Sequence, residues 1–170
     1  MNALIFRFFD ICLLRAAPQD LPASAFLLRA AVMTNIVFGS LMAYPERGMP
    51  QAFIEVLFDF ALLTLLLYGA LQWRQRPERF AQTLTALMGT NVILSFFAMP
   101  VVYAITGSPD GESAGWALQL FLLLVIWNIT VMAHILRHSL SLHIGYTFIM
   151  SVGYVVLAGF LTLTIFGGTA

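Results

Sequence analysis

Residues 50–73 read PQAFIEVLFDFALLTLLLYGALQW, and this stretch decides the fold class. It is long enough to cross a bilayer as a helix, because about 20 residues at a rise of about 1.5 Å each cover a hydrocarbon core of about 30 Å. Two acids, Glu55 and Asp59, lie inside it. A carboxylate there is costly, so it must face protein or water rather than lipid, and it normally has a partner. The stretch therefore predicts a multi-span membrane protein with a polar feature in its interior.

The composition of the whole chain points to the same class. Of 170 residues, 61% are hydrophobic and only 9% are charged, whereas soluble domains carry about 25% charged residues. The eight basic residues are all arginines and are scattered along the chain, so they form no basic stripe and argue against a nucleic-acid partner. The single cysteine, Cys12, cannot form an internal disulfide. The partner that the composition predicts is therefore the lipid bilayer.

Apolar periodicity outlines one surface helix and five membrane spans. At the N-terminus, apolar residues recur at helical spacing, while Arg7, Asp10 and Arg15 lie mostly elsewhere. This pattern is typical of an amphipathic helix at the membrane interface, and the prolines that follow end it. We predict an all-α fold, with an amphipathic interfacial segment at 1–22 and a five-helix transmembrane bundle at 23–170. The predicted spans are 23–44, 50–73, 80–106, 114–136 and 142–166.

Arginines are distributed unevenly between the two sides of these spans. The side opposite the N-terminus has Arg47, the acids Asp110 and Glu112, and an uncharged tail at 167–170. Arg29 falls inside the membrane and is not counted. Because short cytoplasmic segments are enriched in arginine, we predict a cytoplasmic N-terminus and an external C-terminus. The six arginines on the predicted cytoplasmic side are Arg7, Arg15, Arg74, Arg76, Arg79 and Arg137.

Four strongly polar side chains share one predicted depth. When the centre of each span is taken as the midplane, Asn35, Asp59, Asn91 and Asn128 all fall within about 5 Å of it at about 1.5 Å of rise per residue. A carboxylate surrounded by amides is a candidate site for a proton or a cation. The alternative is that these groups only join the helices, with about 0.6–2 kcal/mol for each interhelical hydrogen bond. A shared depth does not fix a shared direction, so both interpretations stay open.

Arg29 is a candidate partner for Asp59. It lies in the cytoplasmic third of the first span, about 10 Å from Asp59 in depth at about 1.5 Å per residue. One hypothesis is a buried Arg29–Asp59 ion pair that orients the core. The other is an arginine whose side chain extends to the cytoplasmic headgroups. Glu55, one turn from Asp59, is expected to reach the outer interface.

Three histidines gather where the fourth span ends and the fifth begins. His134 and His138 are four residues apart and share a helical face, as metal ligands on a helix can, and His143 follows. The acids or cysteines that would complete a metal site are missing nearby, so contacts with headgroups are the alternative. No motif of a hydrolase, a zinc protease or a phosphate-binding loop occurs. We therefore expect no enzyme, no cofactor and no firm metal site.

The chain resembles one known family in layout. Five spans, an amphipathic cytoplasmic N-terminus and a short external tail are similar to the Yip superfamily, the Ypt-interacting proteins and their bacterial relatives. The stretch DICLLRAAPQDLPAS at 10–24 also resembles the start of small proteobacterial inner-membrane proteins. The Asp-Leu-Tyr-Gly-Pro stretch typical of eukaryotic members is absent, which argues against a Rab-like partner. The resemblance implies a non-enzymatic protein of the bacterial inner membrane.

Two functions remain as expectations from the sequence. The first is a scaffold, or an accessory factor for assembly, that acts on a membrane-protein partner or on a second copy of itself. It is favoured by the short connections, which leave no room for a soluble domain, and by stripes of small residues that suit helix packing. The second is a small permease, or a transporter coupled to protons or cations, with Asp59 at the centre of its midplane site.

Overall fold

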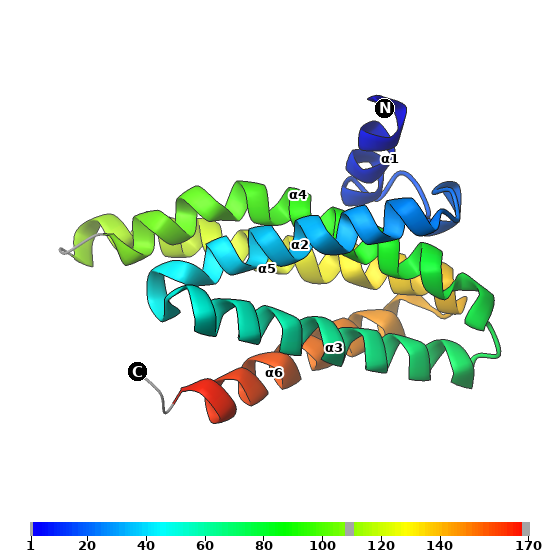
Figure 1. Ribbon diagram of the computed structural model, residues 1–170. Helices are drawn as coiled ribbons and strands as arrows, with labels where there is room; N and C mark the ends of the chain where they lie inside the picture. The colour runs from blue at the N-terminus through cyan, green and yellow to red at the C-terminus, as the bar shows by residue number, and fades with distance from the viewer. Residues whose placement is uncertain (1, 108–110, 168–170) are drawn as a thin grey trace.

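The computed structural model describes residues 2–107 and 111–167, and within these ranges the protein is helical without any strand (Figure 1). Five of the described helices are long and apolar enough to cross a membrane, which confirms the predicted fold class and a multi-pass membrane protein. Asp110, one of the acids predicted on the side opposite the N-terminus, and the end of the tail, 168–170, lie outside the described residues. The elements in order are α1 (Asn2–Cys12), η1 (Pro18–Asp20), α2 (Ala25–Arg47), α3 (Met49–Trp73), η2 (Pro77–Arg79), α4 (Phe80–Thr106), α5 (Gly111–Leu140) and α6 (Ile144–Phe166).

Local sequence explains how α2 and α3 begin. Ser24 precedes α2, and its hydroxyl oxygen accepts a hydrogen bond of 3.4 Å from the amide of Leu27. It thereby satisfies one of the free amides of the first turn. Pro50 lies in the first turn of α3, where its missing N–H would be unpaired in any case. Gly48 joins the two helices with φ at 75°, a conformation that side-chain-bearing residues rarely adopt.

α2 is longer than the sequence predicts. It continues through Pro45 to Arg47 instead of ending at Tyr44. Pro45 has no N–H to donate to the carbonyl of Leu41, four residues earlier. The hydroxyl of Tyr103, in α4, donates to that carbonyl at 3.1 Å. A neighbouring helix thus replaces the lost hydrogen bond, which is one way in which membrane helices accommodate proline.

α5 also extends past its predicted end, from 136 to Leu140. Arginines of the α3–α4 connection bind its last carbonyl groups. Arg79 Nη1 donates to the carbonyls of His138 and Ser139 at 3.0 and 3.2 Å, and Arg74 Nε donates to Leu140 at 3.2 Å. Guanidinium groups satisfy free carbonyls at a helix C-terminus and complement its negative dipole. The four extra residues are therefore held by groups from another part of the chain.

α4 is the centre of the bundle. It packs against α2 on one side and α5 on another, and eleven of its residues are buried, against two in α6. Leucines of α3 and branched residues of α5 complete the apolar core. α6 has the smallest buried share of the five candidate spans. The elements most fixed by packing are thus α4 and its neighbours, and α6 is the least fixed.

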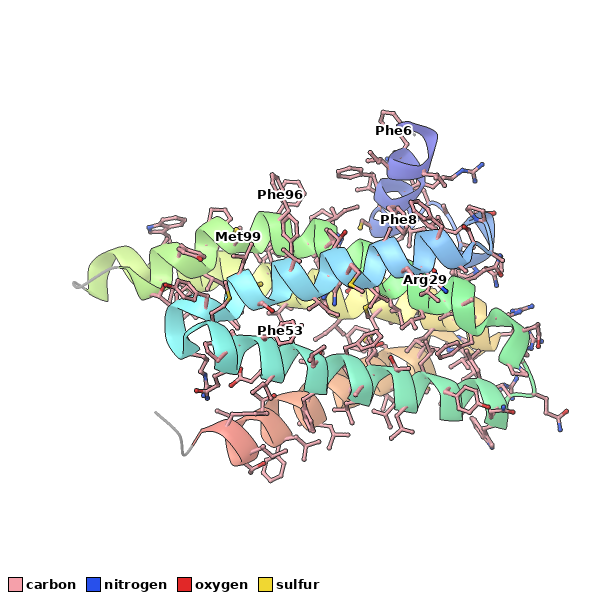
Figure 2. All side chains as sticks on the ribbon, viewed as in Figure 1. Phe6, Phe8, Arg29, Phe53, Phe96 and Met99 are labelled. Atoms are coloured by element: carbon pink, nitrogen blue, oxygen red, sulfur yellow. The ribbon has the colours of Figure 1, made fainter. Side chains whose placement is uncertain are left out.

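The predicted N-terminal helix is present as α1, which lies across the direction of the long helices (Figure 1). Its anchor is Phe8, whose ring contacts Gly89 of α4 so closely that a Cβ on Gly89 would lie 2.2 Å from Phe8 Cε1. At its end, the carbonyl of Cys12 accepts a hydrogen bond of 2.9 Å from Trp127 Nε1 of α5. Phe6 points away from the bundle (Figure 2). α1 therefore projects sideways from the bundle, as a helix in the membrane plane does.

Candidate functional site

A polar cavity of about 140 Å³ lies between the five long helices. Such a volume has room for several water molecules or a small solute. Leucines, methionines and a valine form its apolar walls. Its polar lining comes from every one of the five helices, and includes all four residues that share a predicted depth. The polar lining residues are Asn35 of α2, Asp59 of α3, Thr90 and Asn91 of α4, Asn128 of α5 and Tyr154 of α6.

The three asparagines form a chain of amide hydrogen bonds across the bundle. Asn91 Nδ2 donates to Asn35 Oδ1 at 2.8 Å, and Asn128 Nδ2 donates to Asn91 Oδ1 at 3.1 Å. The amide of Asn91 is thus donor to α2 and acceptor from α5, and α4 is joined to both neighbours. Within the described part of the chain, Asn128 Oδ1 at the end of this relay accepts no hydrogen bond. It remains available to a ligand in the cavity.

Asp59 is joined to α6. The hydroxyl of Tyr154 donates to Asp59 Oδ1 at 2.6 Å, a length typical of a hydroxyl bound to a charged carboxylate. No hydrogen bond reaches Asp59 Oδ2 from the residues described. Asp59 is half-buried, so this second oxygen adds an acceptor to the cavity.

Tyr154 was missed by the sequence analysis. The predicted midplane set contains three amides and one carboxylate, and no tyrosine. Yet Tyr154 is the middle residue of the predicted span 142–166. The same depth argument would have identified it, because a tyrosine buried in a membrane needs a partner for its hydroxyl.

The structure does not contain the predicted ion pair between Arg29 and Asp59. Arg29 is exposed on α2, near the end of that helix beside α1 (Figure 2). It is six residues before Asn35, so at 3.6 residues per turn it points about 120° away from the face that lines the cavity. The ion pair found among the described residues is instead Arg47 with Glu55, with 3.6 Å between Arg47 Nη1 and Glu55 Oε1.

The three histidines are engaged in local contacts. His134 Nε2 lies 3.0 Å from the carbonyl of Ala16, in the α1–α2 connection, and the rings of His134 and His138 meet edge to face at 4.6 Å. His143 Nδ1 accepts a hydrogen bond of 3.2 Å from the amide of Gly145 and so caps α6. Among the described residues, no three potential ligands gather as a metal site would require. These contacts give the histidines a part in holding the α1–α2 connection and the start of α6.

Chemically, the cavity offers acceptor oxygens of one carboxylate and one amide, beside a tyrosine hydroxyl and a threonine. Oxygen ligands of this kind suit protons and hard cations.

Comparison of the chain with family models, with curated proteins and with solved structures finds no match. The similarity to the Yip superfamily therefore stays a prediction from the sequence.

Proposed function

We propose that the protein is a non-enzymatic membrane permease that binds a proton or a small monovalent cation at Asp59. The observation that supports this best is the cavity itself, to which each of the five long helices contributes a polar side chain. Ionisable residues within membrane spans are costly, and they commonly mark a pathway for ions or protons. The function is thus centred on Asp59. Tyr154, which donates a hydrogen bond to Asp59, and Asn128, which lines the same cavity, are candidates for a shared ligand shell.

The cavity favours this function over a purely structural hydrogen-bond network. Groups that only join helices pack against one another, because a gap in the contact loses dispersion energy. Here the amide relay and the Asp59–Tyr154 pair face a common space of about 140 Å³. Two acceptor oxygens, Asp59 Oδ2 and Asn128 Oδ1, take no hydrogen bond from the described residues. Oxygen atoms that accept no hydrogen bond and face the same cavity are better suited to binding a cation than to joining the helices.

Flux through purified protein in liposomes tests this function. Dyes sensitive to pH, Na⁺ and K⁺, enclosed in the vesicles, report which ion moves down an imposed gradient. Asp59→Asn keeps the size of the side chain but removes its charge. We expect it to lower the flux at least tenfold, because about 1.4 kcal/mol of lost binding already gives that factor. The matched control is Glu78→Gln, at an exposed acid outside the cavity. Equal flux in wild type and Asp59→Asn, with both proteins folded, would rule the function out.

The position of α1 favours a second function, that of an accessory protein for a membrane partner. Phe6 and Ile5 are 67% and 53% exposed on a helix that extends beyond the side of the bundle. Exposed apolar side chains on such a projection suit a partner helix or the acyl chains of lipid. A photo-crosslinking residue at position 6 distinguishes them. One reproducible protein adduct supports the accessory function, whereas adducts with lipid alone count against it.

A further inference from the structure

A second acid, Glu55, lies one turn away from Asp59 on the same face of α3. Residues four apart in a helix are neighbours on one side of it, so the two carboxylates follow one another along the helix. Glu55 is nearer to the α2–α3 turn, and the residue is only 9% exposed. The sequence predicts that Glu55 reaches the outer interface, but in the structure it is buried. A buried charge of this kind needs compensation.

The compensation that Glu55 receives is incomplete. Arg47 Nη1 lies 3.6 Å from Glu55 Oε1, close enough for an ion pair but too far for a hydrogen bond. Glu55 Oε1 is buried and has no hydrogen-bond partner among the described residues. The same Nη1 of Arg47 donates to the carbonyl of Phe166 at 3.2 Å. One guanidinium nitrogen is thus shared between a carboxylate of α3 and the last residue of α6.

Further contacts tie the end of α6 at this place. Gln51 Nε2 donates to the same carbonyl of Phe166 at 3.4 Å, and the rings of Phe58 and Phe166 meet edge to face at 6.0 Å. The next polar tie between α6 and α3 is the Tyr154–Asp59 hydrogen bond at the cavity. α6 has only two buried residues. Its position against α3 therefore depends strongly on these two sets of polar contacts.

We propose that Arg47, Glu55 and the carbonyl of Phe166, named here the entrance cluster, form the closed entrance through which a proton or small cation reaches Asp59. This inference rests on the proposed function. Arg47 is the positive charge that occupies the entrance when no ligand is there. A proton or cation that neutralises Glu55 removes the attraction that holds Arg47 in place. The contact between Arg47 of α2 and Phe166 then weakens, which leaves the contacts of Gln51 and Phe58 to hold the end of α6 at this place. The end of α6 can then separate from α2 and α3, and the ligand moves one turn along α3 to Asp59.

Access of a water-soluble thiol reagent to the cavity tests the entrance cluster. The background is Cys12→Ser, which removes the single cysteine of the chain. The reporter is Leu63→Cys, in the cavity wall one turn beyond Asp59. A charged, membrane-impermeant methanethiosulfonate is added to each face of sealed vesicles in turn. Arg47→Gln and Glu55→Gln are each expected to raise the labelling rate from the face with the α2–α3 turn by about tenfold, since either change breaks a buried charge pair.

Two variants with changes away from the entrance cluster serve as controls for the labelling rate. Arg29→Gln and Glu78→Gln remove one exposed charge of each sign elsewhere and are expected to leave the rate unchanged. Unchanged rates in both entrance variants overturn the proposal. If Arg47→Gln does not fold, Glu55→Gln decides alone, because it keeps the shape of the side chain. Failure of the proposed function has a different signature: flux insensitive to Asp59→Asn, while labelling still depends on Arg47 and Glu55.

Discussion

Gly89 of α4 is a point of close contact between α1 and the bundle. A Cβ placed on it would lie 2.2 to 2.8 Å from three ring atoms of Phe8, well inside van der Waals contact. The glycine is next to Thr90, whose carbonyl lies 4.0 Å from the Cys12 thiol, and two residues before Asn91 of the cavity. The absence of a side chain at this one position therefore fixes where α1 lies, directly beside the amide relay.

Gly89→Ala is expected to destabilise the protein by about 1–3 kcal/mol, as overpacking of a tight contact does. The methyl group must displace the Phe8 ring and with it α1. The midpoint of thermal unfolding in detergent measures the change, and Gly159→Ala, at a glycine with open space around it, controls for the general effect of alanine in a helix. In a Phe8→Ala background the penalty should largely disappear, because the two residues are in contact. An equal penalty with and without the Phe8 ring would contradict this account.

Depth along each span indicated four of the polar residues that line the cavity, but not Tyr154 and not which of them are paired. Asn35, Asp59, Asn91 and Asn128 share a height because each lies at the centre of its span, and a bilayer of fixed thickness aligns those centres. The partner of Asp59 depends on how each helix is rotated about its own axis. The depth of a residue in its span carries no information about that rotation. Arg29 has a suitable charge, but it lies on a face of α2 that is turned away from the cavity. Tyr154 lies at the right depth and on the right face of α6, and it is absent from the predicted set.

At the scale of whole elements, the ends of α3, α4 and α6 lie where the sequence predicts them, whereas α2 and α5 end three and four residues later than predicted. Ser24 and Pro50 act locally, within the first turn that follows them. The C-terminal ends of α2 and α5 instead depend on distant groups. Tyr103 binds the carbonyl that Pro45 leaves free, and arginines of the α3–α4 connection bind the last carbonyls of α5. Contacts between residues about 60 positions apart in the chain cannot be read from local propensity.

Arg79 offers a direct test of this arrangement. Arg79→Gln removes a charged donor that binds two carbonyls of α5, and we expect a loss of about 1.5–3 kcal/mol, the range for hydrogen bonds to charged groups. Arg79→Lys keeps the charge but not the fork of donors, so its loss should be smaller. Hydrogen exchange of the last turn of α5 measures the local effect, and Arg15→Gln, at an exposed arginine, is the control. Unchanged exchange in Arg79→Gln would show that the end of α5 is held by other contacts.

At the scale of the whole molecule, the two ends of the bundle differ in their polar chemistry. At the end with the α3–α4 connection, arginines cap α5, and Arg137 is exposed beside them. At the other end, Arg47 is enclosed with Glu55 and the end of α6. One end thus presents positive charge outward, and the other holds its single arginine in an internal contact. This contrast is the structural counterpart of the arginine count, from which the sequence predicts that the α3–α4 connection lies in the cytoplasm.

Reporter fusions test this orientation. Alkaline phosphatase fused after residue 170 is expected to be active, because that enzyme folds only outside the cytoplasm, where its disulfides form. The same reporter fused after residue 76 should be inactive, because Arg74 and Arg76, which precede the fusion point, favour a cytoplasmic location. Activity at 76 and none at 170 would reverse the orientation, and comparable activity at both would indicate two insertion modes. The result also fixes the face on which the entrance cluster opens: with the C-terminus outside, a ligand that neutralises Glu55 arrives from the exterior, and Asp59 receives it before the cytoplasmic half of the bundle does.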